Sequence, residues 1–310
     1  MIEINENNIP LTEIFDDLLI AKKSRLFILR EDLIHPEISG NKWRKLKYNI
    51  EEAQRLNKTI ILTFGGAYSN HIAATAAAGR EYGIKTIGVI RGEETLPLNP
   101  TLQLARDNGM AFKYVSRTQY RENSKYEISF IESLKQEVGD FYLVPEGGSN
   151  AFAVKGCTEI KNNINIVYDI ICSACGTGGT LAGLIASTNK KVLGFPALKG
   201  GDFLKKDIEQ LLNDYQNKFN AEVKNTNWDL ITDYHFGGYA KVKPTLIEFV
   251  QRFKQQHNIP LDLIYTGKML LGIYDILQNT NQLDGKTIVA VHTGGLQGNK
   301  GFEERLGVVL

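Results

Sequence analysis

Residues 166–183, IVYDIICSACGTGGTLAG, join an apolar run to a glycine-rich stretch. The pattern predicts a buried strand over 166–172, a tight turn and a helix over 180–188. A glycine-rich entry to a helix leaves backbone N–H groups unpaired beside a partial positive charge, which suits a phosphate group. The stretch matches neither GxxxxGK[ST] nor GxGxxG, so it does not show which phosphate-containing ligand would bind. A plain strand–helix turn is the alternative interpretation.

Strands and helices of similar length alternate along the rest of the chain. Strands are predicted over 26–31, 59–64, 85–90, 111–115, 141–144, 191–195 and 287–292. Helices are predicted from residue 43, from 71 to 79, after Pro100, and over 127–138, 151–163, 202–218, 244–257 and 269–279. This alternation predicts an α/β fold with parallel sheets covered by helices on both faces.

Composition excludes several classes of protein. The 310 residues carry 36 basic and 35 acidic side chains, a net charge of +1, so neither nucleic acid nor a membrane surface is favoured as a partner. No secretory signal or membrane-spanning run is visible, and three cysteines do not suggest a disulfide framework. We expect a cytoplasmic protein.

Ser39-Gly40-Asn41-Lys42 places a lysine directly after a glycine-bearing turn, at the start of a predicted helix. Lysine amines form Schiff bases with carbonyl compounds. Taken alone, Lys42 is better interpreted as a solvated surface residue. The basic residues 44–47 that follow it are predicted to form a solvated helix face.

Other polar residues occupy the ends of predicted strands. Ser69-Asn70-His71 begins a helix, where it can hold a carboxylate or simply cap the helix. The pair Cys172 and Cys175 forms a CxxC motif that buried packing explains, so no metal site is predicted. Further candidates at loop positions are Tyr239, Tyr265, Thr266 and Thr293. Ligands of open α/β sheets bind outside the carboxyl ends of the strands, and Thr293 follows such an end.

Together these segments resemble the 1-aminocyclopropane-1-carboxylate deaminase and D-cysteine desulfhydrase family, pyridoxal-phosphate enzymes with the tryptophan synthase β fold. The matching segments are REDL (30–33), SGNKWRKL (39–46), GGAYSNHIAATAAAG (65–79), PEGGSN (145–150), GTGGTLAG (176–183), IYTGK (264–268) and HTGG (292–295), with a looser match at GGYAKV (237–242). They cover nearly the whole chain in the family's order.

The resemblance implies two domains, each an open, mostly parallel sheet flanked by helices. We expect a larger pyridoxal-phosphate-binding domain over 1–44 and 147–310, a smaller α/β domain over 45–146, and a homodimer. Lys42 would bind the cofactor covalently, and Asn70 would bond its ring hydroxyl. The phosphate would be held by Thr177, Gly178, Gly179 and Thr180.

The remaining family roles concern the substrate and the cofactor ring. Ser69 would meet the substrate carboxylate, with the amides of Asn70 and His71 beside it. Tyr239 and Tyr265 match the family's two active-site tyrosines, and Thr293, or alternatively Thr266, would face the pyridine nitrogen.

The resemblance implies a lyase that carries out α,β-elimination on a small amino acid, with D-cysteine as the best match. The deaminase branch carries a glutamate after the second tyrosine and a leucine before the final Gly-Gly, whereas this chain has Thr266 and Thr293. Deaminase activity on the cyclopropane acid remains an alternative, as does a non-catalytic phosphate- or nucleotide-binding protein. Tyr68 departs from the family pattern beside the carboxylate site.

Overall fold

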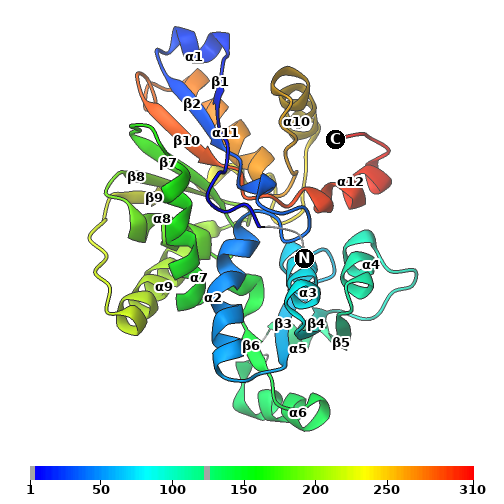
Figure 1. Cartoon of the computed structure of the whole chain (residues 1–310). Helices are drawn as coiled ribbons and strands as arrows, with labels where there is room; N and C mark the ends of the chain where they lie inside the picture. The colour runs from blue at the N-terminus through cyan, green and yellow to red at the C-terminus, as the bar shows by residue number, and fades with distance from the viewer. Residues whose placement is uncertain (1–3, 122–125) are drawn as a thin grey trace.

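The computed structural model describes residues 4–121 and 126–310, in which two β-sheets are arranged one above the other in Figure 1. The larger sheet has six strands in the order β1-β2-β10-β7-β8-β9. Its strands are β1 (Leu11–Ile14), β2 (Arg25–Leu29), β7 (Ile170–Cys175), β8 (Lys191–Pro196), β9 (Trp228–Leu230) and β10 (Thr287–Val291). Only the edge strand β1 is antiparallel to its neighbour.

The smaller sheet has four parallel strands in the order β5-β4-β3-β6. They are β3 (Ile60–Gly66), β4 (Lys85–Arg91), β5 (Ala111–Val115) and β6 (Tyr142–Val144). Its helices are α3 (Asn70–Tyr82), α4 (Pro100–Asp107), α5 (Arg117–Arg121) and α6 (Ile128–Val138). The predicted α/β class, with two sheets dominated by parallel strands, is therefore confirmed.

Helices cover both faces of the larger sheet, because alternate residues of its strands point into two different cores. Leu26 and Ile28 of β2 pack in one core, whereas Phe27 and Leu29 pack in the other. The first core includes α1 (Asp17–Ala21), α10 (Pro244–His257) and α11 (Thr266–Asn279), and the second includes α7 (Ala151–Thr158), α8 (Gly179–Ser187) and α9 (Leu204–Phe219).

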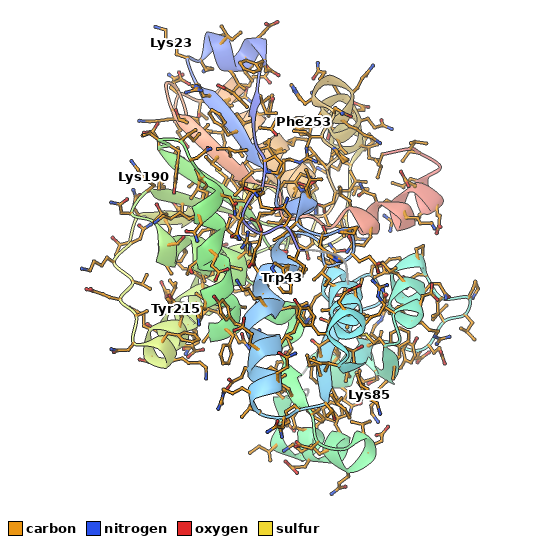
Figure 2. The ribbon with its side chains drawn as sticks, in the orientation of Figure 1. Lys23, Trp43, Lys85, Lys190, Tyr215 and Phe253 are labelled. Atoms are coloured by element: carbon orange, nitrogen blue, oxygen red, sulfur yellow. The ribbon has the colours of Figure 1, made fainter. Side chains whose placement is uncertain are left out.

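Helix α2 (Asn41–Arg55) joins the two sheets. In α2, the spacings of three and four between apolar residues predict one buried face formed by Trp43, Leu46, Ile50, Ala53 and Leu56. The first four are buried in a core that also contains residues of both sheets, whereas Leu56 lies just past the end of the helix and is 41% exposed. Figure 2 shows Trp43 in the middle of the molecule, whereas Lys23, Lys85 and Lys190 lie at its periphery. The first turn of α2 is thereby fixed between the sheets.

Several elements differ from the sequence-based expectation. β7 begins at Ile170 rather than 166, since its pairing with β8 and β10 starts there; Val167 precedes the strand and is 86% exposed although it is apolar. The predicted helix 151–163 ends its α-helical part at Thr158 and continues as a 3-10 helix over Glu159–Asn163. The short elements β1, α1, α5, β9 and α12 (Asn299–Leu306) were not predicted.

Within the described ranges, no helix combines the length and apolarity needed to cross a membrane. The predicted boundaries of the two domains stay a prediction.

Candidate active site

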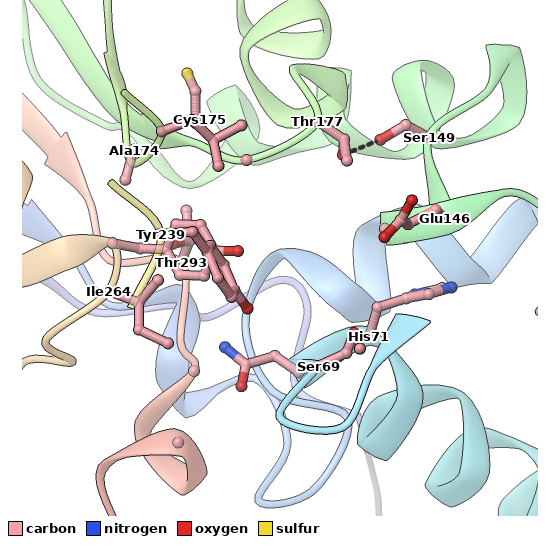
Figure 3. Close-up of a pocket in the computed structure, with 18 of the residues that line it drawn as sticks. Ser69, His71, Glu146, Ser149, Ala174, Cys175, Thr177, Tyr239, Ile264 and Thr293 are labelled. Carbon is pink, nitrogen blue, oxygen red and sulfur yellow. Dashed lines mark hydrogen bonds between the residues drawn. The ribbon is translucent and has the colours of Figure 1, made fainter. Parts of the chain in front are cut away.

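A cavity of about 1040 Å³ lies where the turns following β3, β7 and β10 meet the start of α2. Most of the predicted site residues line it: Lys42, Ser69, Asn70, His71, Thr177, Gly178, Thr180, Tyr239, Tyr265 and Thr293. In Figure 3, Thr177 of the glycine loop lies on one side of this cavity and Ser69 on the opposite side. The structure thus brings together residues that are far apart in sequence.

The turn before Lys42 is built against the end of β10. Gly40 has a φ of 60°, and a Cβ at this position would lie 2.0 Å from the carbonyl oxygen of Thr293. The Asn41 N–H donates to this same carbonyl at 3.3 Å. Only glycine meets both demands, a left-handed φ and close backbone contact, so the first helical turn and Lys42 are fixed in place.

Lys42 projects into the cavity with its Nζ 2.9 Å from Asn41 Oδ1. Desolvation by the surrounding protein, together with the nearby charge of Lys45, lowers the pKa of Lys42 from 10.5 to about 7. The amide group of Asn41 also donates to Thr180 Oγ1 at 2.7 Å, so it links Lys42 to the glycine loop. A lysine with this pKa is available as a neutral nucleophile or base near neutral pH.

The glycine loop ends at the first residues of α8, where backbone N–H groups have no helical partner. Gly178 has a φ of 77° and gives the loop its sharp turn. The hydroxyl groups of Thr177 and Ser149 are 2.5 Å apart at its edge (Figure 3). Gly179 does not line the cavity, whereas its neighbours Gly178 and Thr180 do.

A second buried lysine lies beside this loop and was missed by the sequence analysis. Lys45 donates to the carbonyl of Gly147 and the hydroxyl of Ser149, both at 2.9 Å, and lies 3.3 Å from Thr177 Oγ1. Burial lowers its pKa. Among the described residues no carboxylate forms an ion pair with it, although it lies close to the positive end of α8. The arrangement favours an anion at this place.

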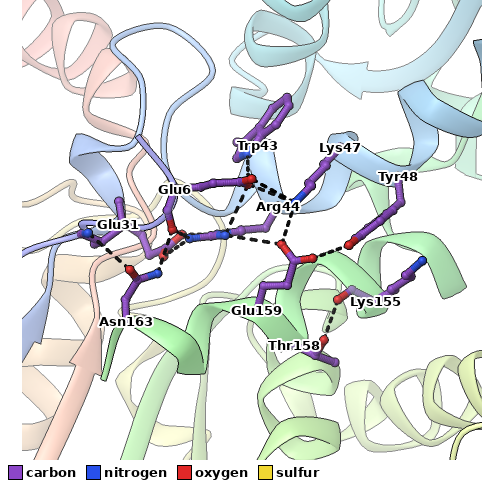
Figure 4. A network of polar contacts seen from close by, with 11 residues as sticks. Glu6, Glu31, Trp43, Arg44, Lys47, Tyr48, Lys155, Thr158, Glu159 and Asn163 are labelled. Atoms are coloured by element: carbon purple, nitrogen blue, oxygen red, sulfur yellow. Dashed lines mark hydrogen bonds and ion pairs between the residues drawn. The ribbon is translucent and has the colours of Figure 1, made fainter. Parts of the chain in front are cut away.

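The prediction that residues 44–47 form a solvated face is wrong. Arg44 is 1% exposed and Lys45 is 3% exposed, because α2 packs on both sides. Figure 4 shows Arg44 and Lys47 amid a cluster of three carboxylates, Glu6, Glu31 and Glu159. The one-turn spacing from Lys42 to Lys45 could have indicated that both lysines face the same side.

The start of α3 forms the opposite wall. Ser69 caps this helix, since its Oγ accepts the N–H of Ile72 at 3.4 Å, while its hydroxyl proton remains available for a ligand. Asn70 Oδ1 is buried without a hydrogen-bond partner among the described residues. The unpaired N–H groups of this first turn can bind a carboxylate.

The His71 ring is held behind this wall. Its Nε2 lies 2.7 Å from Thr63 Oγ1, whose own hydroxyl donates to the carbonyl of Val144. The ring nitrogen is therefore the donor. Burial and the charges of Lys42 and Lys45 hold the pKa of His71 well below its usual value, so the ring is neutral.

The two tyrosines approach each other, with ring centroids 6.2 Å apart and planes inclined by 66°. Burial raises the pKa of both phenols, and the interaction with Tyr265 partly offsets this for Tyr239. Thr293 lines the cavity at the end of β10, whereas Thr266 is fully buried outside it and donates its hydroxyl to Asp262 at 2.7 Å.

Comparison with known proteins agrees with this arrangement. The family model of pyridoxal-phosphate dependent enzymes matches residues 5–294. A Thermotoga maritima protein provisionally named a 1-aminocyclopropane-1-carboxylate deaminase is 30% identical over 286 residues, which cover 88% of this chain and 89% of that protein.

Two further relatives lie in the same group. The bifunctional D-cysteine desulfhydrase/1-aminocyclopropane-1-carboxylate deaminase of Arabidopsis thaliana is 29% identical, with 89% of this chain and 73% of that protein covered. A crystal structure of an ACC deaminase homologue superposes with a TM-score of 0.86 at 26% identity and covers 98% of this chain and 94% of that one. This chain therefore belongs to the pyridoxal-phosphate-dependent enzymes, in the group of 1-aminocyclopropane-1-carboxylate deaminase and D-cysteine desulfhydrase.

Proposed function

We propose that this enzyme carries out α,β-elimination on a small amino acid, with D-cysteine as substrate and pyruvate, sulfide and ammonia as products. The observation that carries the proposal is the cavity that gathers Lys42 with its lowered pKa, a carboxylate-binding helix start and a phosphate-binding loop.

Pyridoxal phosphate, the cofactor of the family, fits two unusual features of this cavity. Asn70 Oδ1 is a buried polar atom that lacks a partner among the described residues. In the part of the chain that the structure describes, the Lys45 ammonium has only neutral oxygen partners beside the start of α8, where a phosphate would supply the missing negative charge. When bound, the cofactor supplies the electron-withdrawing ring that stabilises negative charge at the substrate Cα.

Each cofactor-binding role falls to residues of the cavity or of the adjoining loop. Lys42 would hold the cofactor covalently, Asn70 would bond its ring hydroxyl, and Thr293 would meet its ring nitrogen. Thr266 is less suited, since its hydroxyl is engaged by Asp262. The phosphate would be held by Thr177, Gly178, Gly179 and Thr180, with Lys45.

The chain's own residues also account for substrate binding and proton transfer. The Ser69 hydroxyl and the amides of Asn70 and His71 bind the substrate carboxylate and orient the Cα–H bond. The amine of Lys42, whose pKa is lowered to about 7, takes the Cα proton. The Cβ–S bond then breaks with its electron pair on sulfur, and Tyr239 or Tyr265 supplies the proton that the departing HS⁻ takes up. Water converts the remaining unsaturated amine to pyruvate and ammonia.

The neutral hydroxyl of Thr293 supports elimination from cysteine over opening of a cyclopropane. A neutral partner of the ring nitrogen makes a weaker electron sink than a carboxylate does, and a weak sink is adequate when the leaving group is as good as HS⁻. Deaminase activity is the second candidate, because the Thermotoga relative is provisionally named for it.

The test is a turnover assay of the cofactor-loaded enzyme with D-cysteine, L-cysteine and 1-aminocyclopropane-1-carboxylate. We expect pyruvate and sulfide in equal amounts from D-cysteine. Release of 2-oxobutanoate from the cyclopropane acid alone would replace our proposal with the deaminase, and absence of any keto acid would refute both.

Ser69→Ala tests the carboxylate site. Loss of one hydrogen bond to a charged group should raise KM by roughly tenfold or more. Asn99→Ala is the matched control, because Asn99 caps α4 in the same way without lining the cavity. It should cost about 1 kcal/mol of stability and leave KM unchanged.

A further inference from the structure

Lys268 is a buried lysine in the first turn of α11 to which no role has yet been given. It is 2% exposed, and burial lowers its pKa to about 8. Its ammonium donates to the backbone carbonyls of His235 and Gly238, both at 2.9 Å. Among the described residues it forms no ion pair with a carboxylate. Burial of an ammonium group costs free energy, and the two hydrogen bonds to carbonyls offset part of this cost.

The two carbonyls belong to a strained turn. Phe236, Gly237, Gly238 and Ala240 have φ values of 55°, 99°, 124° and 55°, a backbone region that is unfavourable for residues other than glycine. Two backbone hydrogen bonds close the turn, from the Gly238 N–H to the His235 carbonyl and from the Lys241 N–H to the Gly238 carbonyl. The same two carbonyls thus accept from the backbone and from Lys268, which lies at the centre of the turn.

This turn carries Tyr239, and the helix that supplies Lys268 carries Tyr265 at its N-terminal end. Lys268 follows Tyr265 by three residues, about one helical turn. The segment 265–268 therefore carries Tyr265 and, through Lys268, contacts the turn that carries Tyr239. The segment itself is rigid. The carboxylate of Asp262 accepts the N–H groups of Ile264, Tyr265 and Thr266 at 2.7–2.8 Å.

We propose that Lys268 is a positioning residue that acts through Tyr239. Its ammonium holds the 235–241 turn in its left-handed conformation and thereby sets the Tyr239 phenol against Tyr265 at the edge of the cavity. Without it both carbonyls lose a donor, the turn relaxes, and the two phenols separate. The kinetic consequence rests on the proposed function, whereas the conformational one does not.

Hydrogen exchange of the cofactor-free protein tests the conformational part. In Lys268→Met, amides of residues 235–241 should exchange about 10–100 times faster, since each lost hydrogen bond to a charged group is worth about 1.5–3 kcal/mol. Lys22→Met is the matched control, because Lys22 donates to the Thr280 carbonyl at 3.0 Å just beyond the other end of α11. Unchanged exchange in the turn of a folded Lys268→Met protein would overturn the proposal.

The kinetic part is tested by a double-mutant cycle with the cofactor-loaded enzyme. Lys268→Met should lower kcat roughly tenfold with little change in KM for the substrate, which Ser69 binds. In a Tyr239→Phe background, Lys268→Met should lower kcat by less than about twofold further, because both substitutions remove the same contribution, that of the Tyr239 hydroxyl. Multiplicative losses would show that Lys268 acts independently of Tyr239 and would overturn the proposal.

Gly238→Ala provides a second variant in case Lys268→Met does not fold. A side chain at a φ of 124° distorts the same turn while Lys268 is retained, so kcat should fall as it does in Lys268→Met. If folded Gly238→Ala had the same kcat as the parent enzyme, the proposal would be contradicted. If the parent enzyme turns over no amino acid, the proposed function fails, and the exchange experiment still decides whether Lys268 holds the turn.

Discussion

Helix α2 carries two pairs of basic residues with opposite surroundings. Arg44 and Lys47 meet the carboxylates of Glu6, Glu31 and Glu159, whereas Lys42 and Lys45 face the cavity and form no carboxylate ion pair among the described residues. The charges of Arg44 and Lys47 are neutralised by these carboxylates, and the ion pairs stabilise the fold. In the second pair Lys45 is buried and Lys42 is half-buried, and both have lowered pKa values, as is common at sites that bind an anion or a carbonyl compound.

The largest effect is expected from Lys42→Ala. Loss of the nucleophile and base should lower kcat about 10³-fold, within the range of general acid–base catalysis. Lys47→Ala, on the same helix but in the carboxylate cluster, should keep kcat near the parent value. Comparison of the two rates, with borohydride trapping of the cofactor on Lys42 in the parent, separates the pairs. Appreciable turnover by Lys42→Ala would remove the distinction.

Arg44→Met should damage the fold rather than the chemistry. The substitution leaves Glu31, which is fully buried, without the guanidinium that bonds it through two contacts of 3.0 Å. Breaking such a pair should cost about 3–5 kcal/mol of unfolding free energy, measured by urea denaturation. The double variant Arg44→Met/Glu31→Leu should recover most of this loss. A stable single variant would mean that the cluster does not fasten α2.

Lys45→Met should show the reverse pattern. Removing its charge-assisted bonds should weaken pyridoxal-phosphate binding by about 10–100-fold, equivalent to roughly 1.5–3 kcal/mol. Stability of the cofactor-free protein should stay equal or increase, because a buried ammonium without a counter-charge is removed. An absorbance titration and urea denaturation measure the two quantities. Unchanged cofactor affinity together with a large loss of stability would place Lys45 with the structural pair.

The last prediction concerns the pH dependence of stability. The pKa of Lys42 is about 7 in the folded protein and 10.5 when unperturbed, so between these values the unfolded chain binds a proton that the folded chain lacks. Unfolding free energy of the cofactor-free protein should therefore rise with pH across this window. Lys42→Met lacks this contribution, so the unfolding free energy of the parent should rise relative to that of the variant from pH 7 to pH 10. A difference that does not change with pH would show that Lys42 keeps an ordinary pKa in the folded protein.

Sequence patterns predicted what depends on local periodicity. Most of the buried face of α2 and the order of the longer strands and helices follow from residue spacing and glycine positions, and the structure has both. The burial of Arg44 and Lys45 could not be read from the helix, because their neighbours come from other chain segments. Arg44 contacts Glu6, Glu31 and Glu159, and the partners of Lys45 lie more than 100 residues away.

Thr266 and Thr293 show the same limit at the site. Both are threonines at the ends of predicted elements, and sequence left open which one reaches the cavity. The difference between them depends on Asp262, whose carboxylate accepts the hydrogen bond of the Thr266 hydroxyl. Val167 misled the prediction of β7 for a related reason, since an apolar residue can be exposed beyond the end of a sheet.

The contact between Gly40 and Thr293 has a consequence for the order in which the enzyme is made. The backbone of Gly40 rests on a carbonyl at the end of β10, which lies about 250 residues further along the chain. During synthesis the residues that precede β10 can complete the smaller sheet, but the larger sheet stays in two parts, β1-β2 and β7-β8-β9. The support for Lys42 is still missing at that stage. We therefore expect that capture of the cofactor by Lys42 waits until β10 has left the ribosome and inserted between β2 and β7.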